Sequence, residues 1–181
     1  MDGTEIVWVY GNSSAGKETF IKTISEKKPA DVLRGLGWTG KEIIPCMESI
    51  NWVVQAEGDG NEERRGDLPA VIVKLADKPN SVILIKGQNI DLDEDRLRAV
   101  KTALPRCKHR TIFINTASRE TYERQQKKRW WNSERTLAIV KKHAQDQIER
   151  LKKLQSEFEI VTIDGSSKKN YECFDFPPMV E

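Results

Sequence analysis

The stretch Gly11-Asn12-Ser13-Ser14-Ala15-Gly16-Lys17-Glu18-Thr19 is a glycine-bracketed loop that contains a lysine, and it decides the fold. It follows the apolar run Ile6-Val7-Trp8-Val9-Tyr10 and precedes a helix-like segment. A buried strand aims such a loop, two glycines let several backbone N–H groups face one anion, and the following helix adds its positive end. The spacing matches the G-x-x-x-x-G-K part of the phosphate-loop signature. We therefore predict that residues 11–19 bind the phosphates of a nucleotide, with Lys17 reaching the terminal ones.

One position departs from that signature. The residue after the lysine is normally Ser or Thr, whose hydroxyl helps to hold Mg²⁺, and here it is Glu18. The nearest hydroxyl is one residue later, at Thr19. In this respect the loop resembles those of adenylate kinases, which have Gly-Thr after the lysine, and of some phage-type deoxynucleotide kinases, which have Asp-Thr. The sequence leaves open whether Thr19, Glu18 or mainly water holds the metal, because Mg²⁺ keeps several of its waters.

The composition is that of one soluble domain. The 181 residues suffice for one core with little room for a second, so we expect a single domain over residues 1–181. The 30 basic and 28 acidic side chains nearly cancel to +2, so any basic surface must be local. Three scattered cysteines favour free thiols, and no apolar run approaches the roughly 20 residues that span a bilayer. We therefore expect a cytoplasmic protein with no membrane partner.

Apolar runs separated by helix-like segments predict an α/β fold. Besides the first strand, we expect strands at residues 42–46, 81–85, 111–114 and 160–163. Helices are expected over residues 16–27, 48–55, 68–77, 91–104 and 118–158, the last broken near residues 131–133, and no element is assigned to residues 29–41. This pattern predicts a three-layer sandwich of the P-loop NTPase class, with a five-stranded, mostly parallel sheet and helices on both faces. Ligands bind such sheets at the carboxyl ends of the strands.

A basic helical segment follows the fourth predicted strand, within residues 118–136. Together with the phosphate loop, it makes the chain resemble the small P-loop kinases of the nucleoside monophosphate kinase group, in which such a strand leads into an arginine-bearing helix, a short lid and a second helix. The resemblance implies that Arg124, Arg129 and Arg135 are lid arginines that neutralise charge during phosphoryl transfer. The alternative is a solvated helix face whose cations pair with neighbouring glutamates.

Two further candidates follow predicted strands. Asp164 and Gly165 resemble the Asp-Gly-Ser/Thr turn that flanks the adenine in adenylate-kinase-like enzymes, although Asp-Gly is common in any turn. An Asp that orients Mg²⁺ is expected at the end of the third strand and is missing there. Asp91, a few residues further on, could take this role or simply cap its helix.

The acceptor side is predicted at residues 29–67. Glu48, just past the second strand, is a candidate substrate-binding residue and a general base if the acceptor is an alcohol; a phosphate acceptor needs no base. Gln88 and Asn89 could bind the polar edge of a substrate or cap a loop.

These observations favour an enzyme, a kinase that uses ATP and Mg²⁺ to phosphorylate a nucleotide-like or small hydroxylated acceptor. One alternative is a kinase that acts on a polynucleotide end or a hydroxymethylated base in DNA, with residues 127–131 and Arg64-Arg65 contacting the nucleic acid. Another is a nucleotide-binding regulator with little catalysis, motivated by Glu18 and the missing strand-end Asp. The sequence identifies neither the acceptor nor the oligomeric state.

Overall fold

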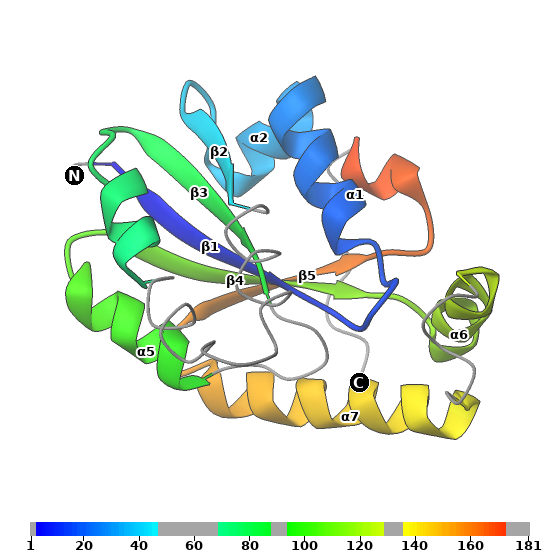
Figure 1. The fold of residues 1–181 in the computed structure, drawn as a ribbon. Helices are drawn as coiled ribbons and strands as arrows, with labels where there is room; N and C mark the ends of the chain where they lie inside the picture. The colour runs from blue at the N-terminus through cyan, green and yellow to red at the C-terminus, as the bar shows by residue number, and fades with distance from the viewer. Residues whose placement is uncertain (1–2, 47–68, 88–93, 129–135, 173–181) are drawn as a thin grey trace.

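The computed structural model describes residues 3–46, 69–87, 94–128 and 136–172, and its centre is a five-stranded sheet (Figure 1). The strand order is β2-β3-β1-β4-β5, and every neighbouring pair is parallel. The strands are β1 (Glu5–Tyr10), β2 (Glu42–Cys46), β3 (Ser81–Lys86), β4 (Lys108–Asn115) and β5 (Glu159–Asp164). The predicted α/β fold is confirmed, and the sheet is parallel throughout rather than mostly parallel.

The central strand β1 is buried along its whole length. Ile6, Trp8 and Tyr10 pack into the core on one face of the sheet, and Val7 and Val9 pack into the core on the other. Both faces are apolar because successive side chains of a strand alternate between them and helices cover both. A strand buried in this way is a continuous apolar run, which is why its position follows directly from the sequence.

Helices form the two outer layers (Figure 1). One face of the sheet is covered by α1 (Lys17–Lys22), the π-helical η1 (Thr23–Lys27), α2 (Ala30–Leu36) and the short 3₁₀ helix η2 (Lys168–Tyr171). The other is covered by α5 (Glu94–Ala103), α7 (Leu137–Leu154) and the helical residues 69–75. Helix α6 (Ser118–Lys127) lies beyond the end of β4. No helix in the described ranges is long and apolar enough to cross a membrane.

Helix α2 lies in the segment 29–41, to which the sequence analysis assigns no element. Pro29 precedes its first turn, where a missing backbone N–H removes no hydrogen bond, and Gly37 ends it in the left-handed conformation with a φ of 76°. Proline and glycine, which argue against a helix when they lie inside one, here mark its two ends. The helix expected at residues 48–55 lies outside the described residues.

A buried ion pair joins β1 and β4 at the amino-terminal edge of the sheet. Arg110 Nε lies 3.2 Å from Glu5 Oε1, and both side chains are almost fully buried. Trp38 Nε1 donates to the other oxygen of this carboxylate at 2.9 Å, and Arg110 also donates to the Leu36 carbonyl oxygen. Burial raises the pKa of Glu5, and the Arg110 charge opposes that rise. The network fixes this edge, while the carboxyl edge is left for the loops described next.

Candidate functional site

The loop of residues 11–16 connects the carboxyl end of β1 to α1, as the sequence predicts. Three of its residues have positive φ, namely Gly11 at 155°, Ser14 at 66° and Gly16 at 113°. Among the described residues, the backbone N–H groups of Ser14, Gly16 and Lys17 have no hydrogen-bond acceptor. Free N–H groups in a loop that curls through left-handed residues form a concave site for an anion. The loop therefore has the backbone geometry of an anion site, and its binding of nucleotide phosphates stays a prediction.

Lys17 lies inside this loop and is only 6% exposed. Its Nζ donates to the carbonyl oxygens of Gly11 at 2.5 Å and Asn12 at 3.0 Å. An ammonium has three donors, so one remains for a phosphate oxygen. Burial, together with the charges of Lys86 and Lys128, lowers the pKa of Lys17 to about 7. A bound anion would favour the charged form again and raise that pKa.

Polar side chains from later in the chain hold the loop from outside. Thr116 Oγ1 donates to the Ala15 carbonyl oxygen at 2.7 Å, and Gln125 Nε2 donates to the Ser13 carbonyl oxygen, also at 2.7 Å. On the side of α7, Asn12 Nδ2 donates to a backbone carbonyl of that helix at 3.1 Å. Two of these bonds engage carbonyls of the loop and the third anchors its Asn12 side chain, so none of them uses the N–H groups of Ser14, Gly16 or Lys17.

Arg124 holds the loop as well. Its guanidinium donates to the carbonyl oxygens of Ser14 and Ala15 at 3.3 Å and of Gly165 at 2.9 Å. Glu120, one helical turn earlier, orients it through an ion pair with 2.5 Å between Nη2 and Oε1. Arg124 therefore joins α6, the phosphate loop and the turn after β5. Its predicted role as a lid arginine stays a prediction.

The other described cations of α6 and its end face solvent. Arg119 pairs with Glu123 at 3.5 Å, and both side chains are largely exposed. Lys127 and Lys128 are exposed at the end of the helix. The ion pairs on α6 agree with the alternative given above, a solvated helix face in which neighbouring glutamates offset part of the positive charge.

The turn after β5 closes tightly on the phosphate loop. The Asp164 carboxylate accepts from the backbone N–H and the hydroxyl of Ser166, both at 2.9 Å, so it stabilises its own turn. At Gly165 a Cβ would lie 2.1 Å from Thr116 Oγ1 and 2.4 Å from the Ala15 carbonyl oxygen. Only glycine fits there without a shift of the neighbours. That Asp164 and Gly165 flank an adenine stays a prediction.

Tyr171 of η2 packs against the start of α1. Its ring meets that of Phe20 edge-on, with 5.5 Å between the centroids. Its hydroxyl lies so close to Gly16 that a Cβ on that glycine would approach it to 2.5 Å. Burial raises the pKa of Tyr171 to about 12, so the hydroxyl stays protonated at neutral pH. The described end of the chain therefore helps to fix the second glycine of the loop.

The residues predicted to hold Mg²⁺ do not complete a metal site within the described ranges. Glu18 is ion-paired with Lys22 at 2.9 Å and with Lys86 at 3.6 Å, and Thr19 is exposed on α1. The described part of the chain contains no cluster of three or more His, Cys, Asp or Glu side chains suited to a metal. The roles of Glu18 and Thr19 as metal ligands stay predictions.

The remaining predicted site residues lie outside the described ranges: Glu48, Gln88, Asn89, Asp91, Arg129 and Arg135. Their roles as base, acceptor-binding residues, metal ligand and lid arginines stay predictions.

Three residues of the site were not predicted, namely Thr116, Gln125 and Lys86. Thr116 and Lys86 come at the ends of the two strands that flank β1, and parallel strands end at one edge, so the predicted sheet already carried a signal for them. For Gln125 the sequence contains no such signal, because its contact with the loop depends on how α6 packs.

The chain was compared with known protein families, curated proteins and solved structures. Neither the protein-family models nor the curated proteins gave a match. Among solved structures, the chain is similar to a gluconokinase from Sinorhizobium meliloti 1021, with a TM-score of 0.51, 12% identity and coverage of 95% of this chain and 89% of that one. It is also similar to deoxyadenosine kinase from M. mycoides, with a TM-score of 0.51, 14% identity and coverage of 92% and 95%.

A third similar structure belongs to the PezAT chromosomal toxin-antitoxin system of Streptococcus pneumoniae, with a TM-score of 0.57, 18% identity and coverage of 91% of this chain and 69% of that one. With the phosphate loop in place between β1 and α1, these likenesses show that the chain has the fold of the small P-loop kinases.

The close approach at Gly165 predicts a cost for any side chain there. We expect Gly165→Ala to lower the free energy of unfolding by about 1–3 kcal/mol, because a new methyl group must displace Thr116 or the phosphate loop. Equilibrium unfolding in urea measures this change in the free energy of unfolding.

The matched control is Gly35→Ala, at an exposed position inside α2, where alanine should stabilise by roughly 0.5–1 kcal/mol. If Gly165→Ala, like Gly35→Ala, were as stable as the parent protein or more stable, the close contact at Gly165 would be wrong.

Proposed function

We propose that the protein is an ATP-dependent phosphotransferase, a small P-loop kinase acting on a nucleotide-like or small hydroxylated acceptor. The observation that carries the proposal is the phosphate loop. Within the described ranges, the buried Lys17 has one donor to spare and the neighbouring backbone N–H groups lack acceptors. A buried ammonium and free N–H groups are unfavourable in an empty site and favourable around phosphate oxygens. The fold shared with known kinases supports the same conclusion.

Phosphoryl transfer requires mainly position and charge. Negative charge spreads over the oxygens of the transferred group, and donors that are already in place stabilise it without reorganising. Here the loop N–H groups would bind the β- and γ-phosphates and Lys17 would offset the developing charge. Thr116, Gln125 and Arg124 would keep the loop in position, since each holds one or more of its carbonyls.

Lys17 is the residue on which this activity depends most directly. We expect Lys17→Ala to reduce phosphate transfer from labelled ATP by about 100-fold or more, the range found when one preorganised donor is removed from a developing anion. The assay screens nucleosides, nucleotides, small alcohols, and oligonucleotides with and without modified bases.

The matched control is Lys27→Ala, which removes a lysine of η1 that pairs with Glu172 on the surface, and it should leave transfer unchanged. Transfer that survives Lys17→Ala would reject the assigned role of the loop. Transfer only to oligonucleotides would favour the DNA-directed alternative. Tight ATP binding with no transfer to any acceptor would favour the regulator.

The lowered pKa of Lys17 predicts how nucleotide affinity depends on pH. In the protein without a ligand, the Lys17 amine is charged below about pH 7 and neutral above it. Bound phosphates favour the charged form and so raise the pKa of Lys17 in the complex. ATP binding should therefore take up a proton above about pH 7, and affinity should fall as pH rises from about 6 to about 8.5.

Calorimetric titration in buffers of different ionisation enthalpy measures this proton uptake. Lys17→Met is the control, because the ligand's own titration is common to both proteins and cancels in the comparison. A Met variant with the same pH dependence as the parent would disprove the assignment to Lys17.

A further inference from the structure

An ion pair occupies the place beside the phosphate loop where a metal site is expected. The signature puts a hydroxyl directly after the lysine to hold Mg²⁺, and many P-loop enzymes add an Asp at the end of a neighbouring strand. This chain has Glu18 at the first position and Lys86 at the end of β3. Their side chains meet, with 3.6 Å between Lys86 Nζ and Glu18 Oε2. Both positions are thus changed, and the two new residues are partners.

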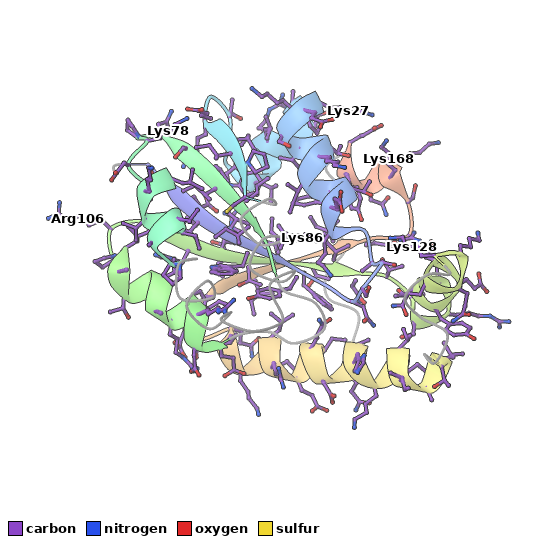
Figure 2. All side chains as sticks on the ribbon, in the orientation of Figure 1. Lys27, Lys78, Lys86, Arg106, Lys128 and Lys168 are labelled. Atoms are coloured by element: carbon purple, nitrogen blue, oxygen red, sulfur yellow. The ribbon has the colours of Figure 1, made fainter. Side chains whose placement is uncertain are left out.

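The sheet fixes where Lys86 lies. Strand β3 runs parallel beside β1, with Lys86 opposite Val9, and the Gly87 backbone N–H donates to the Val9 carbonyl oxygen at 2.7 Å. Lys86 is therefore held two residues before the start of the phosphate loop on the adjacent strand. Figure 2 shows it between the end of β3 and α1, and shows Lys128 at the end of α6, beside the loop.

Among the described residues, lysines gather at this edge. Lys86 and Lys128 are both close enough to Lys17 to lower its pKa, and Glu18 is the carboxylate that meets Lys86. The Lys86 side chain is 23% exposed, so its charge is screened less than that of a surface lysine. The Glu18 side chain is 52% exposed and also pairs with Lys22 at 2.9 Å, so Glu18 keeps a partner if Lys86 turns to another anion.

We propose that Lys86 is a second phosphate-binding residue, whose ammonium does at this site what a protein-held Mg²⁺ does elsewhere. On binding, it exchanges part of its contact with Glu18 for a phosphate oxygen, and together with Lys17 it holds the triphosphate from the β3 side. The inference rests on the proposed function, because it concerns the same phosphates. It adds that binding of the triphosphate needs no metal ligand from the protein.

The competing explanation is a surface ion pair with no ligand. Such pairs contribute little, about 0–1 kcal/mol, and have no effect on a bound anion. The two explanations differ in what happens to ATP affinity when the metal or Lys86 is removed.

The test measures ATP affinity by calorimetry with Mg²⁺ and with EDTA in place of Mg²⁺. We expect the affinity of the parent protein to change by less than about 10-fold between the two conditions, since its own cations hold the phosphates. Lys86→Met should weaken binding in EDTA by about 10- to 100-fold, the loss expected for one hydrogen bond between charged groups. Lys86→Arg should retain most of the affinity, which separates lost charge from misfolding.

Two further variants sharpen the test. Lys22→Met removes the other partner of Glu18, which does not face the loop, and should leave ATP affinity unchanged in both conditions. Glu18→Ser with Lys86→Asp restores the usual hydroxyl and carboxylate, and should bind ATP well with Mg²⁺ and about 10-fold or more weaker in EDTA.

The outcomes distinguish this inference from the function on which it rests. If the parent binds no ATP in either condition, the proposed function fails. If the parent binds ATP but Lys86→Met binds equally well in EDTA, or if the parent itself loses more than about 10-fold in EDTA, the role of Lys86 is wrong and the kinase proposal stands.

Discussion

The contact of the Lys17 ammonium with two carbonyl oxygens of its own loop is the interaction on which the site depends. It is possible only because the loop is curled around the amine, and the curl is held from outside by Thr116, Gln125 and Arg124. Each of these donors comes from the segment that begins at the end of β4. A loop held in this way meets a phosphate without reorganising, which is how preorganised donors lower a barrier.

The two edges of the sheet handle charge differently. At the amino-terminal edge, the buried Arg110 is paired with Glu5 and with Glu159, so its charge is compensated by carboxylates. At the carboxyl edge, Lys17 is buried with carbonyls as its only described acceptors, and Lys86 and Lys128 add to the positive potential there. An uncompensated buried cation is unfavourable, and the lowered pKa of Lys17 expresses that. An anion would remove this penalty, which is the physical reason to expect that the site binds negative charge.

Much of this arrangement follows from the sequence, for physical reasons that differ between elements. Strand β1 and the phosphate loop were predictable because a strand buried on both faces is an apolar run and the loop needs glycines at fixed positions. Helix α2 was not predictable from the sequence. Pro29 and Gly37 mark its two ends, but without the structure they argue equally well against a helix. Arg124 was predicted as a lid arginine, which stays a prediction, and its contacts with loop carbonyls depend on tertiary packing. The ion pair of Glu18 and Lys86 joins residues far apart in the chain. It could not be predicted from the sequence, because it depends on the register of β3 against β1.

The central claim is that the loop around Lys17 recognises a chain of phosphates, and comparing ATP, ADP and AMP as ligands tests it most directly. Calorimetric titration should give affinities that fall by about 10-fold or more with each phosphate removed, as expected when each phosphate contributes charge-assisted hydrogen bonds. Equal affinities for ATP and AMP would place recognition on the nucleoside and would contradict the account.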